Sequence, residues 1–182
     1  AEAALSSHGC SYCLSTPLSM WCDRWFGFSD AEVEALLSHA GREEYLDDAR
    51  EWLEGYRFGR AYCSSPERVI GFLGRGCTAP VRADLYGYAD CLSKVVAGWN
   101  LDRLSVLFDL LEAYGCAEVP LCLGTAEPDV SPDDGMWTAL YLSGFLTTDM
   151  TEEPEHGNRF RALRLPNNEL RQALRLVIIE WF

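Results

Sequence analysis

Apolar residues recur at helical spacing along most of the chain after residue 28. The first helix is predicted to begin at Ser29, which has the spacing of a capping box with Glu32, and to end at Gly41. The same spacing predicts further helices over residues 42–54, 66–73, 85–96, 101–114, 135–143 and 167–182. The predicted fold class is therefore mainly α, a helical bundle.

Three short segments interrupt the helical pattern and are typical of strands. AEVPLCL, residues 117–123, is predicted to be an edge strand, because Pro120 cannot donate to a neighbouring strand. FLTTDM and FRALRLP are predicted to pair as a hairpin across the acidic connection TEEPEHGN. Helix, hairpin and helix in this order predict a small winged-helix-like β-hairpin near the C-terminus. We expect three regions: an irregular arm over 1–28, a helical subdomain over 29–98 and a winged-helix-like subdomain over 99–182.

Composition and charge narrow the classes of partner. The 182 residues are 48% hydrophobic and carry a net charge of -13. This charge repels a phosphate backbone, so nucleic acid is a disfavoured partner. No apolar run reaches the roughly 18 residues of a membrane span, and no basic stretch leads into a secretory segment. We expect a soluble, cytoplasmic protein, and, because the chain starts at Ala1 without Met, a piece of a longer polypeptide.

The N-terminal arm contains residue types that bind zinc. His8, Cys10, Cys13 and Cys22 could hold one ion as a structural zinc knuckle, because two thiolates two residues apart can face the same tetrahedral centre. A zinc site of this kind usually has a second pair at similar spacing, and Cys22 stands alone. Buried or incidental reduced thiols are the favoured interpretation, with no cofactor bound in this chain.

The motifs of common enzyme classes are missing from the sequence. There is no phosphate loop, no dinucleotide-binding glycine pattern, no nucleophile elbow and no H-E-x-x-H pair. Adjacent carboxylates such as Asp133 and Asp134 are typical of solvated helix starts. The residues therefore indicate no catalytic group, and whether the chain belongs to an enzyme stays open.

One segment, GYRFG, combines an arginine with two aromatic residues between glycines. Arg57 lies between Tyr56 and Phe58 in a predicted turn bounded by Gly55 and Gly59, where a guanidinium could be directed at an anion. The alternative is that the aromatic rings anchor the turn while Arg57 pairs with a nearby acid, Glu51 or Glu54. The residues alone favour this second interpretation.

Basic residues cluster near the end of the chain. The cluster comprises Arg159, Arg161, Arg164, Arg171 and Arg175. It could contact a phosphate or a neighbouring domain. DNA binding ranks last among the hypotheses, because the helix predicted over 135–143 has no Lys or Arg and the connection that would form the wing is acidic.

Four segments of the sequence resemble a known family. They are GFSDAEVEALLSHAGREEYLDDAREWLEGYRFG, RVIGFL, MWTALYLSGFLTT and RLPNNELRQALRLVIIEWF. In this order they resemble the bacterial AAA-ATPase-like proteins that carry a C-terminal restriction-endonuclease-like nuclease domain. The resemblance covers most of residues 27–73 and 135–182. The family usually has a Tyr-Asn-Pro-Trp-like string after the glycine-bounded segment, where this chain has Tyr62-Cys63-Ser64-Ser65-Pro66.

The resemblance implies a non-catalytic role for this part of the protein. In the family, the phosphate loop and the acidic Mg-binding strand precede the first segment, and the nuclease follows the last. This chain would be the helical lid and winged-helix-like region, which regulates or transmits nucleotide-dependent change, and ATP and Mg are expected only with the missing core. Lids of AAA type often bring an arginine to the nucleotide, and Arg57 is the candidate.

The partners implied by the resemblance are the ATPase core and a nuclease domain of the same polypeptide. Self-association into a homo-oligomer is a further possibility.

Two other functions stay open beside the regulatory role. The alternative function is a stand-alone protein-interaction module that uses a face rich in Trp and Tyr. A DNA-binding winged helix is the least favoured reading.

Overall fold

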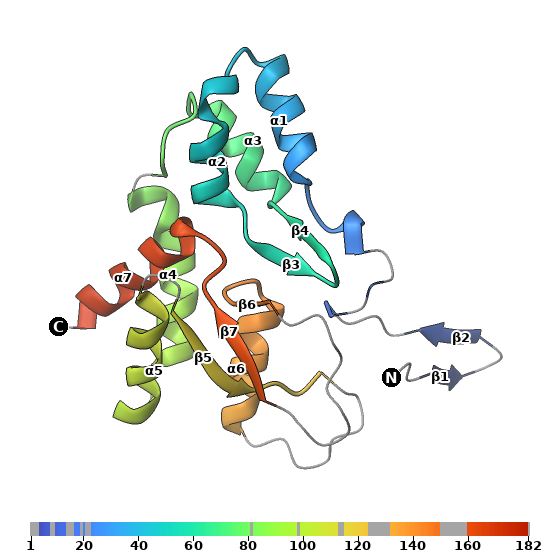
Figure 1. Cartoon of the computed structure of the whole chain (residues 1–182). Helices are drawn as coiled ribbons and strands as arrows, with labels where there is room; N and C mark the ends of the chain where they lie inside the picture. Colours follow the sequence, from blue (N-terminus) through green and yellow to red (C-terminus); the bar gives the residue numbers. More distant parts are fainter. Residues whose placement is uncertain are drawn as a thin grey trace.

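The computed structural model describes residues 4–7, 10–13, 17–18, 20, 23–80, 82–97, 99–112, 115–123, 132–149 and 160–181. Within these ranges the protein is mainly α (Figure 1). The helices are α1 Asp30–His39, α2 Leu46–Leu53, α3 Pro66–Gly74, α4 Arg82–Val96, α5 Leu101–Leu111, α6 Pro132–Leu142 and α7 Asn168–Trp181, with short 3-10 helices η1 Asp23–Trp25 and η2 Glu43–Tyr45. The strands are β1 Ala4–Ser7, β2 Cys10–Cys13, β3 Tyr56–Phe58, β4 Ala61–Cys63, β5 Cys116–Pro120, β6 Thr147–Thr148 and β7 Phe160–Arg164.

The first of two hydrophobic cores is formed by α1, α2 and α3. The predicted capping box begins α1: the Ser29 N–H donates to Glu32 Oε2 at 2.8 Å, and the Glu32 N–H donates to Ser29 Oγ at 3.4 Å. Gly41, with φ of +65°, follows the helix end as predicted. The buried residues of this core are Val33, Leu37, Ala49, Leu53, Val69, Phe72 and Cys77.

A β-hairpin follows α2, where the sequence analysis expected a turn. β3 pairs antiparallel with β4, so GYRFG supplies a strand and its connection, and the prediction of a simple turn is wrong. Gly55, with φ of +112°, directly precedes β3 and lies very close to Pro166, because a Cβ there would be 1.9 Å from the Pro166 carbonyl oxygen. Gly59, with φ of +52°, lies in the connection. Position 55 needs a positive φ and has no room for a Cβ, and only glycine satisfies both conditions without strain.

The second core lies between α4, α5, α6, α7 and a three-stranded antiparallel sheet. α4 packs against α7, and α6 packs against β5. Figure 1 shows these elements below the α1–α3 group, with the β3–β4 hairpin between the two groups. The predicted helical subdomain over 29–98 includes α4, whereas the apolar face of α4 belongs to this core. Its fully buried members include Val96, Leu110, Leu140, Leu163, Leu170, Leu174 and Val177.

The sheet has the strand order β5-β7-β6. β5 is an edge strand that contains Pro120, as predicted, and β6 pairs antiparallel with β7 through Thr148 and Leu163. The residues that connect β6 to β7 lie outside the described ranges. α5 begins at the predicted cap, with Asn100 Oδ1 accepting the Arg103 N–H at 3.0 Å. It ends at Leu111 and not near residue 114, because the backbone turns to an extended conformation at the next residue.

The N-terminal arm contains regular structure that the sequence analysis did not predict. β1 pairs antiparallel with β2, from Ala4 opposite Cys13 to Ser7 opposite Cys10. The expectation of a wholly irregular arm is therefore wrong, since this pairing is formed by backbone hydrogen bonds that need no apolar pattern. Within the described ranges, each helix is too short or too polar to cross a membrane.

Candidate functional site

Arg57 lies at the centre of β3, opposite Tyr62 of β4. Its backbone N–H donates to Thr147 Oγ1 at 3.1 Å, which joins the hairpin to β6. Its Nε donates to the Gly59 carbonyl at 3.0 Å, and its Nη1 donates to the Asp149 carbonyl and, at 3.4 Å, to the Tyr62 hydroxyl. The guanidinium carbon lies 5.2 Å from the centre of the Tyr62 ring, a cation–π distance. The side chain is thus held against the C-terminal region.

The expectation that Arg57 pairs with Glu51 or Glu54 is wrong. Glu51 accepts instead from Asn168 Nδ2 at 2.6 Å. The pKa of Glu54 is raised, chiefly by burial and then by the charge of Asp30, while the charge of Arg50, not Arg57, opposes this shift. Both acids precede the hairpin, and β3 leads away from them toward β6.

Asp149, which follows β6, connects Arg57 to Arg164 of β7. Its carboxylate accepts two bonds from Arg164, Nε to Oδ2 at 2.8 Å and Nη2 to Oδ1 at 2.9 Å, and the Tyr62 hydroxyl donates to Oδ1 at 3.1 Å. The Arg164 guanidinium lowers the pKa of Asp149, and the same bonds raise the pKa of Arg164. We refer to Arg57, Tyr62, Asp149 and Arg164 as the Arg57–Arg164 network. It joins the hairpin of the first region to the sheet of the second.

A second polar contact between the two regions is buried. Arg68 of α3 places Nη1 3.5 Å from Oε1 of Glu169 on α7, whose side chain is 1% exposed. The Arg68 guanidinium also lies over the Tyr88 ring of α4, 4.3 Å from its centre. Nearby, the pKa of Tyr56 is raised, first by burial and then by Tyr88 and Glu169. Arg68 therefore links α3 to α7 through Glu169 and to α4 through the Tyr88 ring.

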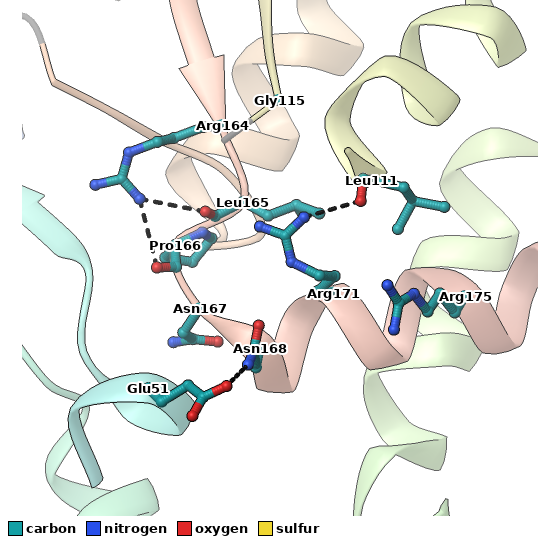
Figure 2. A pocket seen from close by; sticks show the side chains of 10 residues that line it. All are labelled: Glu51, Leu111, Gly115, Arg164, Leu165, Pro166, Asn167, Asn168, Arg171 and Arg175. Atoms are coloured by element: carbon teal, nitrogen blue, oxygen red, sulfur yellow. Dashed lines mark hydrogen bonds between the residues drawn. The ribbon is translucent and has the colours of Figure 1, made fainter. Parts of the chain in front are cut away.

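A pocket of about 590 Å³ opens beside the start of α7 (Figure 2). We call it the basic pocket. It is lined by Glu51, Leu111, Gly115, Arg164, Leu165, Pro166, Asn167, Asn168, Arg171 and Arg175. It brings together three of the five arginines that the sequence analysis grouped. Of the other two, Arg161 is buried on β7, and Arg159 lies outside the described residues.

The zinc hypothesis falls largely on residues whose placement is not described. His8 and Cys22 lie outside the described ranges, and Cys10 and Cys13 are described only as backbone of β2. The described part of the chain holds no group of three or more His, Cys, Asp and Glu residues placed to bind a metal. Burial, and then the charge of Glu54, raises the pKa of the Cys63 thiol to about 11, so that thiol stays protonated and unreactive at neutral pH.

Comparisons of the sequence and the structure with known proteins found no relative. No family model, no curated protein and no solved structure matches the chain. The resemblance to AAA-ATPase-like proteins therefore rests on the sequence segments themselves.

Sequence reasoning missed most of the residues that surround Arg57. Asp149 and Tyr62 were not singled out, because an acid after a strand and an aromatic in a predicted loop are common. Glu169 and Arg68 were also missed. A glutamate followed directly by Leu170 at the start of an apolar helix was the available signal, since Glu169 shares the buried side of α7.

Proposed function

We propose that this chain is a non-catalytic helical module of an AAA-ATPase-like protein, which transmits nucleotide-dependent change from a neighbouring core. The observation that carries the proposal is the Arg57–Arg164 network. Its first residue belongs to the GYRFG segment, and its last two belong to the C-terminal sheet region. A displacement of the β3–β4 hairpin would therefore be passed directly to the sheet.

The order of elements in the second region supports a winged-helix-like arrangement as part of this proposal. α5, β5, α6, β6, β7 and α7 follow one another, and β7 lies between β5 and β6. The helix before the hairpin, α6, has the sequence PDDGMWTALYL without Lys or Arg. A surface of this charge fits contact with protein better than contact with DNA.

Free thiols in the described part of the chain favour a reducing compartment such as the cytoplasm. They belong to Cys63, Cys77, Cys91, Cys116 and Cys122.

Calorimetric titration with Mg-ATP tests this proposal. We expect nucleotide binding that depends on Arg57 only when the polypeptide is extended upstream through the expected ATPase core. Arg57→Ala should weaken that binding about tenfold or more, because one charged contact to a phosphate is lost. Arg57→Lys should retain part of it.

The matched control is Tyr62→Phe. It removes the hydroxyl that bonds Asp149 and Arg57 but keeps the guanidinium. Equal losses in Arg57→Ala and Tyr62→Phe would assign the effect to the hairpin and refute a direct role for Arg57. If the extended polypeptide does not bind nucleotide, the proposed role in an ATPase is refuted.

A second candidate function, a protein-interaction module, is favoured by exposed aromatic residues. Trp25 is 85% exposed, and Phe26, 52% exposed, stacks on Phe58 with ring centres 4.9 Å apart. These rings lie on η1, the segment after it and the β3–β4 hairpin, and not on a helical face. If a second copy of the chain covers them, Trp25→Ser should shift a concentration-dependent dimer toward monomer in analytical ultracentrifugation. A strictly monomeric chain would refute self-association.

A further inference from the structure

The basic pocket carries more positive charge than its own surroundings balance. Arg164 is neutralised by the bidentate carboxylate of Asp149, and its Nη1 donates to the Leu165 and Pro166 carbonyls at 3.2 and 3.4 Å. Arg171 directs Nη1 to the Leu111 carbonyl at 2.9 Å (Figure 2) and to the Glu112 carbonyl at 2.6 Å. Carbonyl oxygens accept hydrogen bonds but carry no full charge, so the cation of Arg171 is not neutralised.

Arg175 adds a second uncompensated charge one turn further along α7. It is exposed, and no described residue forms an ion pair or hydrogen bond with it. Glu51, the carboxylate in the lining, accepts from the neutral Asn168 amide and keeps its own charge, so it offsets one of these two cations and leaves the pocket with one positive charge in excess. The pKa of Arg171 is lowered, chiefly by burial and then by repulsion from Arg175 and Arg164. Like charges four residues apart destabilise a helix, which an anion between them would relieve.

The geometry points to the chemistry of that anion. Arg171 and Arg175 lie on one face of α7 because they are four residues apart, and planar guanidinium groups bind phosphate oxygens in pairs. The chain as a whole carries a charge of -13, so this pocket is a local exception and not part of a general basic surface. Its volume of about 590 Å³ lies within the range of small-molecule sites.

We propose that the basic pocket binds the phosphoryl group of a small phosphorylated molecule through Arg171 and Arg175. Arg164 and the backbone around Pro166 form its wall. The pocket shares Arg164 with the Arg57–Arg164 network, but Arg57 does not line it. Substitution of Arg175 tests the pocket, and substitution of Arg57 tests the nucleotide-coupling role, so the two can fail separately.

The test is calorimetric titration of the full chain with inorganic phosphate, pyrophosphate and adenosine monophosphate at constant ionic strength. Saturable binding is expected, and Arg175→Gln should weaken it about tenfold or more. Arg24→Gln is the matched control: it removes the same charge from an exposed residue of η1. It should leave binding unchanged. Arg175→Lys should give an intermediate affinity, because the charge stays while the planar fork is lost.

The arms of the titration also separate the sources of the phosphoryl group. Adenosine monophosphate that binds more tightly than phosphate would show a nucleotide as the ligand, and equal affinities would show that the phosphoryl group alone is recognised. Heats that match sodium chloride would overturn the proposal. Equal affinities in the unsubstituted chain and Arg175→Gln would overturn it too, as would equal losses in Arg175→Gln and Arg24→Gln. Arg175-dependent binding of duplex DNA without saturable phosphate binding would replace it with a nucleic-acid site.

Discussion

Substitution of Arg68 by methionine removes the cation of the buried contact between α3 and α7. Glu169, with 1% of its side chain exposed, would then keep a carboxylate without the cation that lies 3.5 Å away. Breaking a buried ion pair from one side costs about 3–5 kcal/mol. The Arg68 side chain is 21% exposed, so water can partly screen the remaining charge, and we expect the lower end, about 3 kcal/mol. This is a large share of the roughly 5–15 kcal/mol by which a domain is stable.

Urea denaturation followed by far-UV circular dichroism and tryptophan fluorescence measures this loss. With a slope of about 2–3 kcal/mol per molar urea, the midpoint should fall by roughly 1 M. The double variant Arg68→Met with Glu169→Leu should recover much of the stability, because a matched apolar pair leaves no buried charge. Arg24→Met serves as the control for removing an exposed arginine.

Two results would refute this reasoning. A loss of less than about 1 kcal/mol in Arg68→Met would show that the pair lacks the assumed coupling, since even exposed pairs reach that value. A double variant as unstable as the sum of the single variants would show that the two side chains act independently.

Three other predictions concern the backbone and the network. Gly55→Ala should lower the free energy of unfolding by about 2 kcal/mol or more, because the new Cβ would meet the Pro166 carbonyl. Gly41→Ala, at a position with positive φ but open space around it, should lower the free energy of unfolding by only about 1 kcal/mol. Urea titrations of the two variants measure the difference. The pKa of Asp149 is lowered in the folded protein, so its charge stabilises the fold above the unfolded pKa, and this stabilisation is lost as pH falls through the folded pKa. The stabilisation is under about 1 kcal/mol, because the side chain is 55% exposed. The stability difference between the chain and Asp149→Asn should therefore shrink below about pH 4 in denaturation series at each pH, and a constant difference would contradict the role of its charge. Ser29→Ala should cost about 1 kcal/mol in thermal unfolding, and no change would show that the capping box is not needed.

The helices could be predicted because their signals are local. A cap such as Ser29 or Asn100 bonds a backbone group within three residues, and an apolar stripe reports the buried face wherever the partner lies. The edge position of β5 was also predictable, since Pro120 restricts a strand regardless of its neighbours. These elements depend little on which distant segment packs against them.

The candidate site depends on distant contacts, and for this reason it was predicted poorly. Arg57 is separated by ninety positions from Thr147 and by ninety-two from Asp149, so no pattern near GYRFG indicated either partner. β3 has only three residues, too few for a period of two to be recognised. Of the five arginines grouped from the sequence, Arg164, Arg171 and Arg175 line the basic pocket, but sequence alone did not separate the buried Arg161 from them.

The division into two cores has a consequence for the order in which the protein can fold during synthesis. All residues of the first core precede residue 78, so this core can close soon after that part of the chain has left the ribosome. The apolar face of α4 must wait until α7 has been made, because Leu170, Leu174 and Val177 complete the core around it. Until α7 is made, the apolar face of α4 lacks the residues that bury it, and exposed apolar surface of this kind makes a partly folded chain prone to aggregate.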